Sequence, residues 1–294
     1  MAHSLIGLIG NTPLVLSKSL NTNPNVTLYF KMEGHNPGGS VKDRAAYNMI
    51  VGGMERGDIT STTPLIEATS GNTGIALAMI ASLFELNIEL VMPENATKER
   101  IQTMRAYGAK VTLTPKEVGI EGARDYAENK VKKEGYYMLN QFANEDNWKA
   151  HYKSTGPEIW SDTKGLVTHF VSSMGTTGTI MGTSTYLKEM NNEVQIVGVQ
   201  PTDESSIPGI RKWPKAYLPK IFDAKKVDQI IEVSESEARI MTKRLAKEEG
   251  IFAGMSSGGA TAAALKLADS MERGTIVSII CDRGDRYLSS DLFE

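Results

Sequence analysis

From residue 64 onwards the sequence alternates short apolar runs with longer amphipathic ones, and this alternation constrains the fold more than any other feature. Short apolar runs favour buried strands, whereas apolar residues at helical spacing favour helices. Strands that alternate with helices form βαβ units on a parallel sheet. The pattern predicts strand and helix pairs at residues 64–67 and 73–86, 88–92 and 97–107, and 110–114 and 119–134.

The same alternation returns in the second half of the chain. It predicts strands at residues 168–172, 195–200 and 275–280, and helices at residues 179–190, 236–249 and 258–273. A chain of 294 residues exceeds the usual size of one domain. We therefore expect two α/β domains that share a cleft and are interleaved by the chain. Residues 202–227 have little periodicity and predict a long ordered loop, which in compact domains is often functional.

Composition excludes several classes of protein. A net charge of -3 gives no electrostatic reason to expect nucleic acid or an anionic membrane as a partner. No apolar run has the length of a bilayer, and the N-terminus lacks the pattern of a signal peptide, so we expect a cytoplasmic protein. Cys281 is the only cysteine, which excludes an internal disulfide. The four histidines lack metal-ligand spacing, and we expect no metal.

Residues 36–44, NPGGSVKDR, place a lysine directly after a glycine turn. Ser40 is a candidate helix cap, and Lys42 falls in the first helical turn. The positive end of the helix dipole disfavours a second positive charge and lowers the pKa of an amine. Such a lysine can form a Schiff base with an aldehyde cofactor. Taken alone, the segment is more typical of a solvated surface lysine.

Three glycine-rich turns follow predicted strands and open predicted helices, at residues 68–74, 173–179 and 254–259. Ligands of open α/β sheets bind at such places, where helix N-termini present free N–H groups. The first turn has groups that suit a carboxylate, and the hydroxyls of the second suit a phosphate. Each turn alone is also compatible with a capped strand-to-helix connection. Neither nucleotide-binding glycine fingerprint is present, which disfavours NAD or ATP.

Together, residues 36–44, 69–74, 175–179 and 256–258 resemble the fold-type II pyridoxal 5′-phosphate (PLP) enzymes, and within them the cysteine synthases. The likeness covers essentially the whole chain from residue 9. Three segments, 172–179, 205–211 and 279–289, resemble the isoform B group, which also uses thiosulfate. The resemblance implies two three-layer α/β/α domains of the tryptophan synthase β-like fold with the active site in the interdomain cleft. A smaller mobile domain would comprise residues 40–145, and a larger one residues 1–39 and 146–294.

The resemblance also assigns roles to residues. Lys42 would hold PLP as an internal aldimine and move the α-proton. Asn72 would contact the cofactor 3′-oxygen, and Ser256 would meet its pyridine nitrogen. The cofactor phosphate would be held by Gly175, Thr176, Thr177, Gly178 and Thr179. The substrate carboxylate would be held by Thr69, Ser70, Asn72, Thr73 and Gln141.

The implied reaction is a β-replacement on O-acetyl-L-serine. PLP acts as an electron sink, and a neutral hydroxyl at its pyridine nitrogen favours loss of the β-leaving group. Acetate would leave, and an α-aminoacrylate intermediate would add sulfide to give L-cysteine or thiosulfate to give S-sulfocysteine. Two such half-reactions imply ping-pong kinetics. The family also suggests a homodimer.

The second substrate is where isoform B is expected to differ. Arg211, Lys212, Cys281 and Asp282 would make the pocket polar, and a cation near its entrance favours a dianionic nucleophile. Family members commonly have two arginines where this chain has Arg211 and Lys212, and lysine lacks the guanidinium fork. The pair is also compatible with solvated loop charges, Cys281 with a small buried apolar residue, and Asp282 with a turn residue.

Other functions fit less well. Within the same family, cystathionine β-synthase and serine/threonine dehydratase are the alternatives, but residues 281–289 resemble isoform B. A non-catalytic role, in which the cleft docks the C-terminal tail of serine acetyltransferase, is disfavoured because every expected PLP contact is present. A nucleotide-binding dehydrogenase is more remote still.

Overall fold

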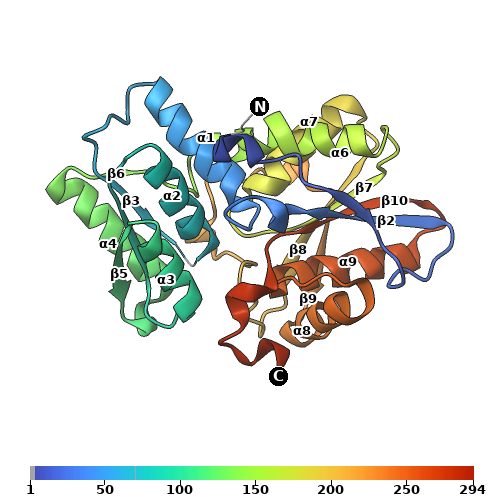
Figure 1. Ribbon diagram of the computed structural model, residues 1–294. Helices are drawn as coiled ribbons and strands as arrows, with labels where there is room; N and C mark the ends of the chain where they lie inside the picture. The colour runs from blue at the N-terminus through green and yellow to red at the C-terminus, as the bar shows by residue number, and fades with distance from the viewer. Residues whose placement is uncertain (1–3, 70) are drawn as a thin grey trace.

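The computed structural model describes residues 4–69 and 71–294, which form two β-sheets that lie side by side with helices on their faces (Figure 1). The larger sheet has the strand order β1-β2-β10-β7-β8-β9 and the smaller one β5-β4-β3-β6. Neighbouring strands are parallel, except that β1 runs antiparallel to β2. The strands are β1 (Leu14–Leu16), β2 (Val26–Met32), β3 (Leu65–Ala68), β4 (Ile88–Pro93), β5 (Lys110–Thr114), β6 (Tyr137–Met138), β7 (His169–Ser173), β8 (Gln195–Pro201), β9 (Gln229–Val233) and β10 (Gly274–Ile280).

Helices follow most of the parallel strands, as βαβ connections require. The α-helices are α1 (Lys42–Glu55), α2 (Asn72–Leu83), α3 (Lys98–Ala106), α4 (Gly119–Glu134), α5 (Glu145–Ala150), α6 (Gly156–Asp162), α7 (Gly178–Met190), α8 (Glu235–Arg244) and α9 (Met255–Ser270). A π-helical turn, His151–Thr155, joins α5 to α6, and another, Leu245–Glu249, extends α8. In the described part of the chain no helix has the length and apolar character needed to cross a bilayer.

Each face of the smaller sheet is buried against a different set of helices. Successive side chains of a strand point to opposite faces, so neighbouring residues of β3 enter separate cores. Leu65 joins the cluster formed with α1 and α2, whereas Ile66 packs against Ile120 and Ala123 of α4. Because both faces of the sheet are covered, all four residues of β3 are buried, including Glu67.

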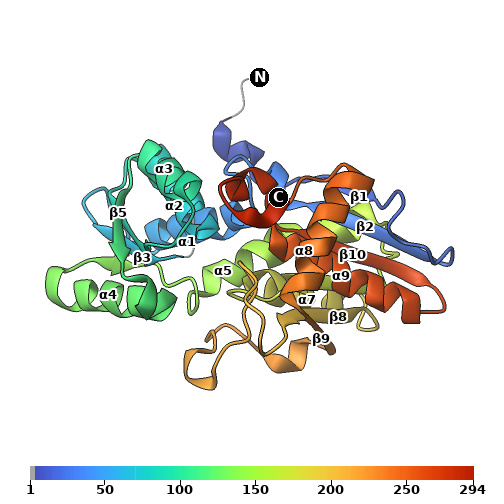
Figure 2. The ribbon, with the colours of Figure 1, turned by 90° about the horizontal axis from the view of Figure 1, so that it is seen from below.

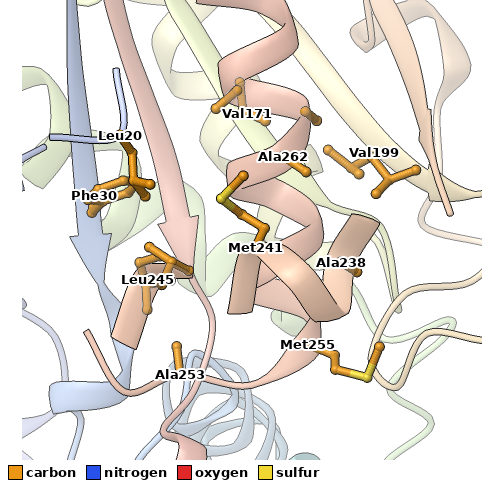
Figure 3. Close-up of a cluster of buried hydrophobic side chains, with 14 of the residues drawn as sticks. Leu20, Phe30, Val171, Val199, Ala238, Met241, Leu245, Ala253, Met255 and Ala262 are labelled. Carbon is orange, nitrogen blue, oxygen red and sulfur yellow. The ribbon is translucent and has the colours of Figure 1, made fainter. Parts of the chain in front are cut away.

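The larger sheet is covered in the same way. Figure 3 shows the core between one of its faces and helices α8 and α9, where Phe30, Val171 and Val199 meet Met241 and Ala262. On the other face, a second cluster packs against α6 and α7. Both cores hold the carboxyl ends of β7 and β10 in fixed positions, from which the next residues emerge towards the smaller sheet (Figure 1).

The predicted α/β class and the strand and helix pairs from residue 64 are confirmed, with bounds that differ by a few residues. Strands β1, β2, β6 and β9 and the helices α1, α5 and α6 complete the pattern; of these, only α1 was anticipated, as a helix running from Ser40 through Ile50. The predicted loop at residues 202–227 is irregular apart from two short 3-10 turns, Lys215–Tyr217 and Ala224–Lys226. The chain leaves the larger sheet after β2, forms the smaller sheet, and returns with β7. Domain limits at residues 40 and 145 stay a prediction.

Candidate active site

A cavity of about 300 Å³ lies between the two sheets. Parallel strands place their carboxyl ends at one edge of a sheet, and ligands bind there. The residues that follow β3, β7 and β10 all contribute to the cavity wall, among them Asn72, Gly175 and Cys281. Segments far apart in the sequence therefore converge on one site, as the resemblance implied.

Lys42 is the first residue of α1 and lines this cavity. Among the described residues, nothing accepts a hydrogen bond from its Nζ. Burial is the largest influence on the amine and lowers its pKa, because the charged form is poorly solvated there. The helix has Val41 at its N-cap position without a side-chain cap, although Ser40 Oγ accepts a hydrogen bond from Lys42 N at 3.3 Å. The expected role of Ser40 is therefore shifted by one residue.

The cavity is electropositive even though the whole chain has a net charge of -3. Its described lining includes four basic side chains and neither aspartate nor glutamate: Lys42, Arg100, Lys116 and Arg211. A cleft lined by one sign of charge raises the local concentration of ligands of the opposite sign. The site therefore suits anions such as phosphate, carboxylate and an anionic nucleophile.

The turn between β7 and α7 has the properties of an anion cradle. The backbone amides of Gly175, Thr176 and Thr177 have no acceptor within the described structure, and the buried hydroxyl of Thr177 has no partner there either. Thr177 adopts a positive φ of 70°, which aims successive amides in one direction. A methyl group at Gly178 would overlap Asn147 Oδ1, so only glycine fits there. Unpartnered amides at a helix N-terminus bind phosphate.

Ser256 lines the cavity from the first turn of α9. Its carbonyl accepts a hydrogen bond of 2.7 Å from Ser173 Oγ, which ties α9 to the turn that carries the anion cradle. Gly175 and Thr179 line the same cavity, as does Lys42. A lysine, an anion cradle and a neutral hydroxyl around one cavity match the aldehyde, phosphate and ring nitrogen of PLP, so the residues present fit this cofactor.

The loop after β3 is held in shape by its own side chains. Thr69 is buried, and its Oγ1 accepts hydrogen bonds from the amides of Gly71 and Gly74 at 3.1 and 3.0 Å. Thr73 lines the cavity and donates to Gln141 Oε1 at 2.7 Å, while Gln141 Nε2 donates to the carbonyl of Ala68 at 2.8 Å. Thr73 and Gln141 thus face the site, whereas Thr69 supports the loop from behind. Ser70 lies outside the described residues.

The buried carboxylate of Glu67 holds the backbone at Gln141 in place. Glu67 accepts hydrogen bonds from the backbone amides of Asn140, at 2.6 Å, and Gln141, at 3.3 Å. Burial raises the pKa of Glu67 to about 7, since the two amides and the distant cation Arg124 offset only part of the desolvation. The carboxyl therefore fixes the backbone on which Gln141 reaches the cavity.

The structure separates the two basic residues of the 202–227 loop. Arg211 lines the cavity, and its backbone amide is fixed by a 2.8 Å hydrogen bond to the carbonyl of Met174. Lys212 instead turns outwards and binds Asp203 Oδ1 and Glu232 Oε1 at 2.6 and 2.8 Å. The expectation that Lys212 makes the pocket polar is therefore not supported, because these two carboxylates hold its ammonium group outside the cavity.

Cys281 and Asp282, which follow β10, have different positions. Cys281 lines the cavity, and burial raises the pKa of its thiol to about 11, which disfavours a thiolate nucleophile. Asp282 is buried behind the cavity wall, where its Oδ2 accepts hydrogen bonds from Asn72 Nδ2 at 2.6 Å and from Tyr287 Oη at 2.7 Å. Asp282 thus supports Asn72 rather than forming the pocket surface.

Sequence reasoning missed four large side chains in the cavity wall: Arg100, Phe142, Trp213 and Tyr287. Trp213 donates to the carbonyl of Gly175 at 2.7 Å and meets the edge of Phe142 with ring centroids 5.3 Å apart. Tyr287 lies under the guanidinium of Arg100 at 4.8 Å. Three of them had a signal: Trp213 lies in the proline-rich loop that was expected to be functional, Phe142 follows Gln141, and Tyr287 lies within residues 279–289.

Comparison with known proteins agrees with this geometry. A model of the pyridoxal-phosphate dependent enzyme family matches residues 5–282. The cysteine synthase B of Pseudomonas aeruginosa is 58% identical over 97% of this chain and 96% of its own, and that of Salmonella typhimurium is 54% identical over 99% and 96%. The crystal structure of a cysteine synthase from Entamoeba histolytica has a TM-score of 0.94 and 36% identity, covering 100% of this chain and 91% of the other.

An O-acetylserine dependent cystathionine β-synthase from Helicobacter pylori is also similar, with a TM-score of 0.92, 36% identity, and coverage of 100% of this chain and 99% of that one. Since proteins with different reactions share the fold, the fold alone does not select among them. The sequence identity does select among them, because it is higher to the cysteine synthases B than to this cystathionine β-synthase, over nearly the full length of both chains. The chain therefore belongs to the pyridoxal-phosphate dependent enzyme family, in its cysteine synthase group, as its motifs had indicated.

Proposed function

We propose that the protein catalyses β-replacement on O-acetyl-L-serine, in which sulfide displaces acetate and L-cysteine forms. The observation that carries this proposal is the unpartnered amine of Lys42 in a cavity whose described lining has no acidic side chain and which includes part of the anion cradle after β7. The relatives named cysteine synthase B support the choice of substrates.

Lys42, the anion cradle at residues 175–179 and Ser256 would hold PLP, which when bound supplies an electron sink for charge at the substrate α-carbon. Thr73 and Gln141 face the cavity and would orient the substrate carboxylate, together with the loop amides that Thr69 holds in place. Burial keeps a larger fraction of the Lys42 amine uncharged, so Nζ can take the α-proton and return it to the product. Acetate leaves the β-carbon, and the sulfur nucleophile takes its place.

A product assay tests this proposal against the other members of the family. With O-acetylserine and sulfide, the holoenzyme is expected to release cysteine and acetate in equal amounts. A dehydratase would release ammonia and a keto acid from serine or threonine, and a cystathionine β-synthase would require homocysteine. Either of these outcomes, without cysteine formation from sulfide, would refute the assignment.

We also propose that thiosulfate is accepted in place of sulfide, giving S-sulfocysteine, because Arg211 brings a cation into the cavity wall. Arg211→Ala is expected to lower kcat/KM for thiosulfate by about tenfold and for sulfide much less, since a dianion loses more from removal of a charge. Lys212→Ala is the matched control and should leave both values nearly unchanged, because Lys212 is bound to Asp203 and Glu232 outside the cavity. Equal losses for both nucleophiles in Arg211→Ala would contradict the electrostatic explanation.

A cytoplasmic homodimer is a further part of the proposed function. Several large apolar side chains of the N-terminal segment are exposed, namely Leu5, Leu8, Val15 and Leu16, and burying them against a second copy of the chain would be favourable. Sedimentation of the holoprotein at two concentrations would give the mass of the assembly. The docking of serine acetyltransferase is not part of the proposal.

A further inference from the structure

The residues after β10 form hydrogen bonds with three separate segments: the start of α3, the start of α2 and the turn before α1. We call residues 282–289 the C-terminal clasp. In Figures 1 and 2 this part of the chain, drawn in red, lies between α3 and the helices of the larger sheet. The clasp contacts the start of α3 in two places. Thr97 Oγ1 donates a hydrogen bond of 3.1 Å to the carbonyl of Arg286. The Glu99 carboxylate accepts hydrogen bonds from Ser289 N and Oγ at 3.0 and 2.6 Å.

Arg286 is the buried centre of the clasp. Its Nη2 donates a hydrogen bond to the carbonyl of Gly38, in the turn that precedes Lys42. Its Nη1 donates to Asn72 Oδ1 at 2.7 Å, at the start of α2. One guanidinium therefore joins the segment that carries the reactive lysine to the segment that carries the predicted cofactor-contacting amide. The fork of arginine allows this, because its donors diverge in a fixed plane.

Asn72 is held from both sides, and the chemistry of its partners fixes its orientation. An arginine can only donate and an ionised carboxylate can only accept, so the oxygen of the amide must face Arg286 and its nitrogen must face Asp282. Asp282 is itself fixed by Tyr287 Oη and by a backbone bridge to Ser40. The two possible amide flips of Asn72 are therefore far from equal in energy.

This arrangement leaves one hydrogen of the amide available. The NH₂ group of asparagine carries two hydrogens, and Asp282 accepts one of them. Asn72 lines the cavity, so the second can serve an acceptor there. We propose that Arg286 is a positioning residue that sets the amide of Asn72 with its donor side towards the cofactor oxygen in the cavity. This inference rests on the proposed cofactor site.

Arg286→Met tests the proposal, with Arg283→Met as the matched control from the same clasp. Arg283 is exposed and paired with Asp285, away from Asn72. Two measurements are made on the PLP-loaded protein. The first is the visible absorption spectrum of the bound cofactor, which responds to hydrogen bonds at its ring oxygen. The second is kcat and KM for O-acetylserine. Arg286→Met is expected to shift the band and lower kcat/KM by about 10- to 100-fold, since misplaced groups cost catalysis steeply. Arg283→Met should change neither.

A double-mutant cycle shows whether Arg286 acts through Asn72 or through the Gly38 turn. In an Asn72→Ala background, Arg286→Met should produce less than about a twofold further change and no further band shift, because coupled residues are not additive. A full additional loss there would overturn the proposal and assign the effect to the turn before Lys42. An Arg286→Met spectrum like that of the wild type would overturn it as well.

Two further outcomes, a variant that does not fold and a protein that does not bind PLP, can be told apart from failure of the proposal. If Arg286→Met does not fold, Arg286→Lys replaces it; a lysine cannot make both bonds, so the band shift should persist, and a wild-type spectrum in that variant would refute the proposal. If the proposed cofactor site itself is wrong, the wild-type protein will show no visible band with PLP. The proposal on Arg286 can therefore fail while the proposed function stands.

Discussion

Lys42→Ala is expected to abolish the β-replacement reaction, with a fall in the rate of cysteine formation of at least about 10⁴-fold. The variant loses both the amine that attaches the cofactor and the group proposed to carry the α-proton, and a general base alone contributes roughly 10²- to 10⁴-fold. Among the described lining residues, the guanidinium groups of Arg100 and Arg211 can only donate hydrogen bonds, and burial raises the pKa of the Cys281 thiol, so none of these three replaces it. The measurement is the initial rate with O-acetylserine and sulfide.

Borohydride reduction of the PLP-loaded wild type should label the peptide that contains Lys42, and no label should appear there in Lys42→Ala. Lys153→Ala, which removes an exposed lysine outside the cavity, is the control for general effects of the substitution. Residual activity above one hundredth of the wild-type rate, or a label on a different lysine in the wild type, would contradict the assignment of Lys42.

Arg44→Met is expected to cost the holoprotein about 3 to 5 kcal/mol of unfolding free energy, the penalty for leaving a buried charge without its partner. Arg44 is buried, and its guanidinium makes two bonds of 2.8 Å to Glu33 and two of 2.6 and 2.7 Å to Glu158. These contacts fix α1, which begins with Lys42, against α6 and against the 3-10 turn Glu33–His35 that follows β2. Arg244→Met, which breaks a half-exposed pair with Glu248 on one helix, should cost below about 1 kcal/mol.

The same variant should change how stability depends on pH. Arg44 and the hydrogen bonds around Glu33 outweigh the effect of burial and lower the pKa of that carboxyl to about 2. A lowered pKa means that the stabilisation is present above the unfolded value near 4.5 and is lost as the pH falls towards 2. Urea unfolding between pH 6 and 3 should therefore show a steeper acid loss in the wild type than in Arg44→Met. Parallel curves would show that Glu33 does not depend on Arg44.

The strands that the sequence predicted are those whose apolar runs stand alone between helices, such as β4 and β10. Strand β2 escaped prediction because it contains Lys31, which is fully buried and bonded to Glu158 at 2.9 Å, so its apolar run is interrupted. Strand β9 lies at the sheet edge and is largely exposed, and β6 has only two residues. In each case the signal is tertiary, since a partner from elsewhere makes the segment a strand.

Like the strands, the residues of the candidate site fall into those that the sequence predicts and those that it does not. The turns at residues 69–74 and 175–179 could be predicted because each is a continuous segment whose own residue types specify its shape. Arg100 reaches the cavity only through packing, and nothing near it in the sequence indicates this. Phe142 follows Gln141 and Tyr287 lies within residues 279–289, so these two have predicted neighbours although neither was itself predicted. Neighbouring residues can also lie on different sides: Arg211 lines the cavity, whereas Lys212 pairs with Asp203 outside it. Which side of an irregular loop faces inwards depends on acceptors far away, here Glu232.

The place of β2 beside β10 has a consequence for how the protein is made. The smaller sheet uses four strands from one continuous stretch, so it can form while the ribosome is still working. The larger sheet has its second strand next to its last, and at about 5–20 residues per second β10 is translated on the order of tens of seconds after β2. During that interval one edge of β2 has no neighbour, and closing it requires contacts between residues as distant in the sequence as Val26 and Gly274. The cavity wall includes Ile279 of β10 and Cys281 directly after it, so the pocket is complete only once this last strand is in place.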